Sequence, residues 1–403
     1  MSIPAPAHTT ANEVRCRRFL RYYYLATFFY DFIFAYAIYT VFFSLRGMTV
    51  FQISLLLSWW CLAGILLEVP TGALADSWSR RKMMALAPLI KSLCFVTWFL
   101  AGHSFYLFAL GFFLWSLGSS FRSGTSEALL YDALVHYGRR DDYEKVLGRR
   151  QFYFHIGLAV STLSGGFIAS RRMDWAILLS VIPLLLSAAS AFLIEETPKV
   201  QSTGEVRYLQ HIRLALREIR SNRGLLYLLV YLFGIGVFGG LEEFEQLYYR
   251  LAGLPIFAFG IASFLGSLLC ALAARAAHRM KNGVFATYAL PFASGTLLVL
   301  VWRFPSIPAI GAYLVGYALT TPTRVLTEAR IQHSITGVSR ATVTSTISLL
   351  LEAFGVGMPV IHGLIGTMWH LPAIFLAGGI QLFALSAWAF AMRKRMATGA
   401  AEG

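Results

Sequence analysis

Apolar runs of about 20 residues recur along the whole chain, and each is long enough to cross the hydrocarbon core of a bilayer as a helix. Only helices and closed barrels can span a bilayer, because every backbone polar group there must be satisfied internally. The sequence predicts twelve spans, at residues 19–44, 50–71, 83–102, 105–126, 152–170, 175–194, 224–246, 256–274, 284–302, 307–327, 343–366 and 371–392. The expected fold class is therefore an all-α polytopic membrane protein with twelve transmembrane helices.

The composition excludes an ordinary soluble domain. Hydrophobic residues make up 57% of the 403 residues and charged residues only 13%, whereas about a quarter of a soluble chain is charged. The cysteines are scattered, at Cys16, Cys61, Cys94 and Cys270, with no Cys-x-x-Cys pair. We therefore expect no disulfide framework, no metal site and no cofactor. No short cleavable signal is visible, so we expect the first span itself to direct insertion.

The net charge of +14 comes from bases that lie mainly on one side of the predicted spans. With both termini in the cytoplasm, only five of the 34 Lys and Arg residues fall on the other face: Arg46, Arg171, Arg172, Arg250 and Arg303. Three more fall inside spans: Lys91, Arg122 and Arg324. This asymmetry predicts a multi-pass protein of the cell (inner) membrane with cytoplasmic termini. The bases then act as topology signals that also contact anionic lipid, and no nucleic-acid partner is expected.

The longest polar interval, Glu195 to Arg223, separates six spans from six. We expect an N-terminal six-helix bundle at 1–194, a cytoplasmic linker at 195–223 and a C-terminal six-helix bundle at 224–403. Apolar residues at helical spacing in 205–223 predict an amphipathic linker helix, which either lies on the inner leaflet or is simply solvated.

An internal repeat supports two pseudo-symmetric bundles. Three short segments of the first half have counterparts in the same order in the second half. The pairs are 46–49 with 252–255, 72–76 with 270–274, and 126–128 with 327–329.

The segment Glu68–Lys82 gathers two acids, a proline, a glycine and three adjacent cations between two predicted spans. We interpret it as a turn at the cytoplasmic water interface. Its spacing, Gly72-x-x-x-Asp76-x-x-x-Arg80-Arg81, resembles the loop between helices 2 and 3 of the major facilitator superfamily, in particular a bacterial drug or metabolite efflux-like branch. The resemblance implies two six-helix bundles around a central cavity that opens alternately to each side.

In that superfamily the matching acid and bases form a latch that joins the two halves in the outward-facing state. The resemblance thus implies a conformational latch, and we expect Gly72 to permit tight helix approach there. Its predicted members are Gly72, Asp76, Arg80 and Arg81, with Glu127, Asp132 and the region of Arg340 as partners. Ser77 and Ser79 replace an expected Arg and Gly. The alternative interpretation is a turn that only sets orientation.

Span 5 contains Gly157, Ser161-Thr162 and Gly165-Gly166. This pattern is similar to the Gly-x-x-x-Gly-Pro-x-x-Gly-Gly of some antiporters of the superfamily, with the central Gly-Pro pair changed to Ser-Thr. It favours either an exporter signature or ordinary close packing of small residues on a neighbouring helix.

Ionisable residues inside spans are energetically costly and usually face a cavity or a partner. Asp31 lies in the middle of span 1 among aromatic residues, where it either exchanges a proton during transport or makes a helix-packing hydrogen bond. Glu242 corresponds to Tyr36 in the repeat, and Glu352 is a candidate partner for Arg122 or Arg324. The predicted proton-coupling or substrate-cavity residues are Asp31, Tyr36, Arg122, Glu242, Glu245, Arg324 and Glu352.

These features favour a secondary active transporter that exports a drug-like or secondary-metabolite solute by proton-coupled alternating access. The alternative is a proton-coupled importer of a small metabolite or siderophore. A membrane enzyme is disfavoured because no metal-ligand cluster or aqueous catalytic domain is apparent, and a sensor that has lost transport is a further alternative. The expected partners are a small-molecule substrate, protons and membrane lipid, and we expect a monomer.

Overall fold

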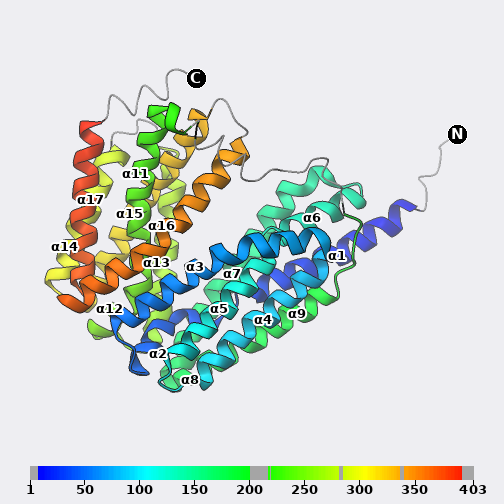
Figure 1. The fold of residues 1–403 in the computed structure, drawn as a ribbon, viewed down its shortest axis with the longest axis horizontal. Coiled ribbons are helices and arrows are strands. Elements are labelled where there is room, and N and C mark those ends of the chain that lie inside the picture. The colour runs from blue at the N-terminus through cyan, green and yellow to red at the C-terminus, as the bar shows by residue number, and fades with distance from the viewer. Residues whose placement is uncertain (1–7, 200–216, 218, 281–284, 336–339, 393–403) are drawn as a thin grey trace. The chain divides into compact units, whose positions relative to one another are not determined.

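The computed structural model describes residues 8–199, 217, 219–280, 285–335 and 340–392, and these residues form helices without any strand (Figure 1). The first half contains α1 (His8–Tyr30), η1 (Phe34–Ala37), α2 (Tyr39–Leu45), α3 (Val50–Ser77), α4 (Arg80–Leu100), α5 (Phe105–Arg122), α6 (Thr125–His136), η2 (Arg140–Asp142), α7 (Tyr143–Arg171), α8 (Met173–Leu179) and α9 (Val181–Phe192). The second half contains α11 (Arg223–Gly239), η3 (Gly240–Phe244), α12 (Glu245–Leu251), η4 (Ile256–Ala258), α13 (Phe259–Ala277), η5 (Phe285–Ala289), α14 (Leu290–Arg303), α15 (Ile307–Ser334), α16 (Arg340–Met368) and α17 (Ala373–Ala391). The η elements are short 3-10 helices, except for η5, which is a π-helix.

The described residues of each predicted span are mainly helical, and several spans contain a short break. Within the described ranges, nine helices are long and apolar enough to cross a membrane: Asn12–Leu45, Val50–Glu68, Arg80–Leu100, Arg140–Arg171, Met173–Phe192, Arg223–Leu251, Ile256–Ala277, Thr346–Met368 and Ala373–Ala391. Most of the predicted linker helix, 205–216 and 218, lies outside the described residues.

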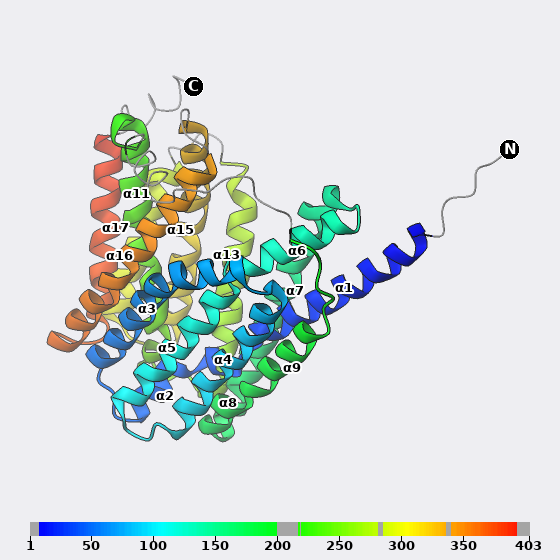
Figure 2. The same cartoon turned by 45° about the vertical axis from the view of Figure 1, so that its right-hand side comes forward.

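The chain divides into two compact units. Unit 1 contains Met1–Tyr39 and Trp59–Thr203, and unit 2 contains Thr40–Ser58 and Gly204–Gly403. In unit 1, α4 packs between α5 and α9, and α1 packs on α9 and α7 (Figures 1 and 2). In unit 2, α14 packs on α15 and α17, and α15 also contacts α13 and α11.

The division differs from the one predicted, because residues 40–58 group with unit 2 and not with the rest of the N-terminal half. Specific contacts explain the difference. The buried Gln246 Oε1 accepts hydrogen bonds from the Thr40 backbone N–H at 3.1 Å and from the Thr40 hydroxyl at 2.9 Å. Ser54 packs so closely on Gly363 that a Cβ at that glycine would overlap the serine side chain.

The first span is not the continuous helix that 19–44 predicts. Helix α1 ends at Tyr30, residues 31–33 are not helical, and the chain resumes through η1 and α2. The Ser180 hydroxyl accepts a hydrogen bond from the Ala35 backbone N–H at 3.1 Å. This bond satisfies one of the donors that a helix end leaves without an intrahelical partner.

Span 7 is broken at the matching place, where η3 separates α11 from α12. In each half a seven-residue helix follows the break, and the next turn contains a glycine with positive φ, Gly47 at 85° and Gly253 at 81°. The turns also share a backbone hydrogen bond, Met48 N–H to Phe43 O at 3.0 Å and Leu254 N–H to Tyr249 O at 2.9 Å. The backbone of residues 46–49 therefore has the same turn as that of residues 252–255, as the first pair of the predicted repeat implies.

The segment Glu68–Lys82 is mostly helix and not a turn. Helix α3 continues to Ser77, with Pro70 inside it, and α4 begins at Arg80. Ser79 caps α4 by accepting a hydrogen bond from the Lys82 backbone N–H at 3.1 Å, as serine favours at this position. The expected close approach at Gly72 is not present, since an added Cβ would meet no described atom within 4 Å.

The small residues of span 5 pack closely on the first span. A Cβ at Gly157 would lie 2.7 Å from the Phe28 carbonyl oxygen, and one at Gly165 would overlap the Phe34 carbonyl. The span 5 glycines thus make the close contacts that the packing interpretation predicts, and small residues commonly allow such backbone contact between membrane helices.

Candidate functional site

A buried ion pair lies beside the break in the first span. Lys91 of α4 is only 1% exposed, and its Nζ donates to Asp31 Oδ1 at 2.9 Å. The Tyr36 hydroxyl of η1 donates to the same oxygen at 2.9 Å, and Lys91 Nζ also donates to that hydroxyl at 3.3 Å. The break positions Asp31 and Tyr36, while continuous helix positions Lys91.

Aromatic rings surround these charges. Lys91 Nζ lies 4.4 Å from the ring centre of Tyr30 and 4.9 Å from that of Trp115. Arg122, the last residue of α5, has its Cζ 3.9 Å from the ring centre of the same Tyr30. Cations at these distances are attracted by the ring face, so Tyr30 holds two cations at once.

The structure thus brings three of the predicted residues, Asp31, Tyr36 and Arg122, into one cluster. The sequence indicated Lys91 only as a base inside a span, and its role as the partner of Asp31 was not predicted. The pairing could have been predicted from the high cost of an unpaired charge inside a membrane span, which favours pairing of an acid with a base in a neighbouring span. Asp31 is accordingly half of an ion pair, whereas the sequence predicted either a proton-exchanging acid or a helix-packing hydrogen bond.

A small polar pocket opens next to this cluster in unit 1, at the junction of α5 and α6. The residues that line it are Tyr30, Ser119, Arg122, Ser123, Gly124, Ser126, Glu127 and Arg150. Glu127 forms an ion pair with Arg150 of α7. The structure therefore pairs this predicted latch residue with a base that was not among its predicted partners.

The acids of span 7 have hydroxyl partners in unit 2. Glu242 accepts a hydrogen bond from Tyr317 of α15 at 2.6 Å, and Glu245 accepts one from Ser263 of α13 at 2.9 Å. Neither acid forms an ion pair with a Lys or Arg of the described residues. Two neutral donors therefore hold the two carboxyl groups.

In the described part of the chain, the remaining predicted residues of unit 2 form no ion pair with these acids. Arg324 Nε forms an ion pair with Glu328 Oε1 at 2.8 Å, one turn further along α15. The sequence had indicated Glu352 as a candidate partner. The side chain of Glu352 is exposed on α16.

The bases after α3 contact acids within unit 1. Arg80 forms an ion pair with Asp132 of α6, and their side chains are 17% and 3% exposed. Arg81 Nε lies 3.6 Å from Glu196 Oε2. Lys199 Nζ donates hydrogen bonds to the carbonyl oxygens of Ala75 at 3.0 Å and Trp78 at 2.7 Å. A cation on the last carbonyls of a helix is favourable, so the segment after α9 stabilises the end of α3.

Of the predicted latch contacts, the structure contains the one between Arg80 and Asp132. The side chains of Asp76 and Arg340 lie outside what the structure describes. The latch role of this group stays a prediction.

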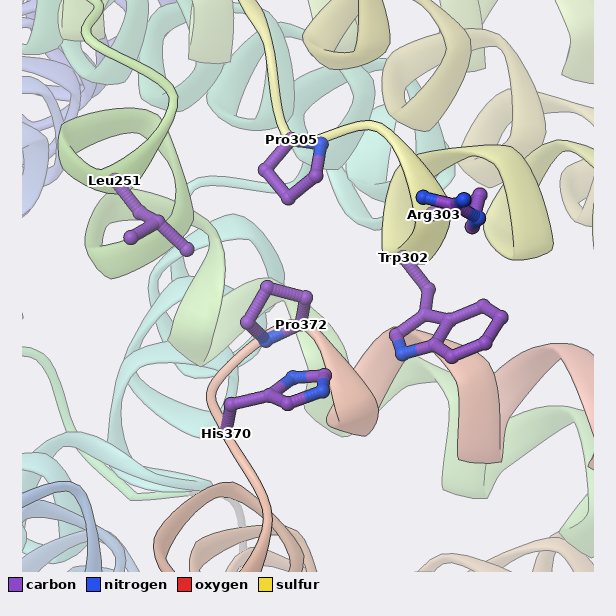
Figure 3. Close-up of a pocket in the computed structure, with 6 residues that line it drawn as sticks. All are labelled: Leu251, Trp302, Arg303, Pro305, His370 and Pro372. Atoms are coloured by element: carbon purple, nitrogen blue, oxygen red, sulfur yellow. The ribbon is translucent and has the colours of Figure 1, made fainter.

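A second pocket, in unit 2, contains none of the predicted residues. It lies where α12, α14 and the segment before α17 meet, and Figure 3 shows Trp302 and Arg303 at the end of α14 and His370 and Pro372 before α17. No acid lines it.

Apolar helices in two halves, each beginning with a span that is broken next to ionisable side chains, are typical of a membrane transporter. Residues 23–327 match the Major Facilitator Superfamily, so the chain belongs to this family. Members of the family are transporters and not enzymes, and the chain is a multi-pass membrane protein that transports a small-molecule substrate. The predicted family and fold class are confirmed, and the family fold implies twelve spans.

Solved structures share the fold at low sequence identity. A bacterial homolog of the human lysosomal transporter Spinster, inward-facing and unoccupied, is 14% identical with a TM-score of 0.76, covering 96% of this chain and 98% of its own. A mutant of the nucleoside transporter NupG is 12% identical with a TM-score of 0.76, covering 94% and 99%. The human organic anion transporter TETRAN is 18% identical with a TM-score of 0.56, covering 92% and 98%. No curated protein sequence matches the chain.

Proposed function

We propose that this transporter is a proton-coupled exporter of a drug-like or secondary-metabolite solute. The observation that carries the coupling is the environment of Glu245 in unit 2. This partly buried acid lies inside an apolar span, and it accepts a hydrogen bond from the neutral hydroxyl of Ser263. A carboxylate without a counter-cation is costly at membrane depth, so protonation of Glu245 relieves that cost.

Asp31 is a weaker proton carrier than Glu245, because Lys91 already compensates its charge. Its pair with Lys91 is better suited to hold unit 1 in one packing until solute binds. Glu242, whose partner is the hydroxyl of Tyr317, is the second proton-carrier candidate.

Export is supported by the sequence of α7, which retains three of the four glycines of an antiporter pattern. The aromatic side chains around Lys91 suit an amphipathic solute. Tyr36 and Trp115 lie 5.5 Å apart between ring centres, and Trp60 lies 5.8 Å from Trp115. Rigid aromatic faces supply apolar contact with polar edges.

Proteoliposomes with an imposed pH gradient test the coupling. Anionic, neutral and cationic aromatic solutes, for example fluorescein, benzamide and ethidium, are offered as substrates while a trapped pH dye reports proton movement. Glu245→Gln should abolish accumulation driven by the gradient but retain solute exchange, because exchange needs no net proton transfer. Glu13→Gln, at an exposed ion pair with Arg17, is the matched control and should behave as the wild type.

Gradient-driven transport that survives in both Glu245→Gln and Glu242→Gln would exclude this coupling. Direction is decided by the solute content of cells with and without the protein. A solute that accumulates inside only when the protein is present would favour the importer over export.

A further inference from the structure

The polar pocket of unit 1 contains more positive than negative charge. Arg150 and Glu127 compensate each other as an ion pair. Arg122 lines the same pocket and forms no ion pair with an acid of the described residues. Asp31, the acid of the neighbouring cluster, is already bound by Lys91 and Tyr36. The cluster therefore keeps one cation in excess, which is costly inside a membrane protein unless an anion compensates it.

One residue that lines the pocket has a buried hydroxyl without a hydrogen-bond partner among the described residues. Tyr30 lines the pocket and is only 4% exposed. Its hydroxyl has no hydrogen-bond partner within the described part of the chain. Buried polar groups are nearly always paired, so the unpaired hydroxyl indicates a ligand that accepts a hydrogen bond. The Arg122 guanidinium lies against the same ring, 3.9 Å from its centre, and is thereby oriented.

The third contribution comes from the start of α6. Gly124 is its N-cap, with a φ of 66°, and lines the pocket. The N-terminus of a helix presents backbone N–H groups and the positive end of the helix dipole, both of which favour anions. The hydroxyls of Ser119 and Ser123 add donors at the same place.

We propose that this pocket binds the anionic group of the transported solute, a carboxylate, phosphate or sulfate. The proposal rests on the transport function proposed above and names the substrate class of that site. Its volume of about 230 Å³ is below that of a pocket for a whole drug-sized ligand, so it holds the charged group alone. The fork of Arg122 matches the oxygens of such a group, and the excess positive charge of the cluster repels a cation.

The test measures binding at equilibrium. The purified full-length protein is unfolded thermally with inorganic phosphate or benzoate, against chloride at equal ionic strength and against benzamide, the neutral analogue of benzoate. Phosphate and benzoate should raise the melting temperature, because a ligand of the folded state stabilises it. Benzamide should not.

Three variants localise the effect. Arg122→Gln should weaken binding of benzoate by about tenfold or more, since it removes hydrogen bonds to a charged group. Tyr30→Phe deletes only the hydroxyl and should weaken binding by roughly threefold to tenfold, which keeps the proposal testable if Arg122→Gln fails to fold. Arg171→Gln, at an exposed arginine at the end of α7, should retain full binding.

The outcomes separate the alternatives. Anion stabilisation that is absent, or that is unchanged in both Arg122→Gln and Tyr30→Phe, would overturn the proposal. Stabilisation by phosphatidylglycerol vesicles but not by phosphate or benzoate, against phosphatidylcholine as the reference, would assign the pocket to a lipid headgroup and also overturn it. Proton-driven transport without anion binding would refute only the anion site, while anion binding without proton-driven transport would refute only the proposed coupling.

Discussion

At the scale of single residues, the centre of unit 1 depends on mutual compensation of charge. Lys91 is almost completely buried and contacts Asp31, Tyr36 and two aromatic faces. A buried charge whose partner is removed is strongly destabilising, whereas replacing the whole pair with apolar residues is often neutral. Removing one member of the pair therefore perturbs both stability and transport.

Asp31→Asn alone should lower the free energy of unfolding by roughly 3–5 kcal/mol, because it leaves Lys91 buried and unpaired. The double variant Asp31→Asn with Lys91→Met should recover most of that loss. Thermal unfolding of the purified variants in the same detergent measures both. A single variant as stable as the wild type would show that the ion pair does not stabilise the fold. Transport by the double variant then isolates any role of the Asp31 charge.

At the scale of helices, α4 and α5 meet through glycines. A Cβ at Gly118 of α5 would lie 2.6 Å from the Ala87 carbonyl oxygen and 3.0 Å from Lys91 Cβ. The atoms it meets belong largely to backbone, which cannot turn away as a flexible side chain would. The position of Lys91 therefore depends on a residue without a side chain on the neighbouring helix.

Gly118→Ala should destabilise the protein by about 1–3 kcal/mol, because overpacking forces the helices apart. Gly311→Ala is the matched control, since that helical glycine has open space around its Cβ position and alanine favours helix by up to about 1 kcal/mol. Melting temperatures of both variants provide the comparison. Equal melting temperatures would contradict the close packing of α4 on α5.

At the scale of the whole molecule, the distribution of charge predicts how the chain crosses the membrane. The turn after α4 contains Gly102 and His103 and no Lys or Arg, while the turn after α6 contains Arg139 and Arg140. Bases favour the cytoplasmic side. The two turns should therefore lie on opposite faces of the membrane.

Alkaline phosphatase, which is active only outside the cytoplasm, reports this orientation. A fusion after His103 should be active, and a fusion after Arg139 should be inactive. A fluorescent protein at the C-terminus should fold and fluoresce in the cytoplasm. The reverse activities would contradict the predicted orientation, and activity at both positions would contradict the number of spans between them.

The sequence by itself determined the class of the protein. Apolar length, the three-base cluster Arg80–Lys82 and the repeat indicated the fold and the family, because each is a property of consecutive residues. Only the tertiary structure decided which side chains contact each other. Lys91 reaches Asp31 across 60 positions of sequence, Arg150 takes Glu127, and the helix breaks at Asp31. Such pairings depend on which faces of distant helices pack together, and the periodicity of a single span does not contain that information.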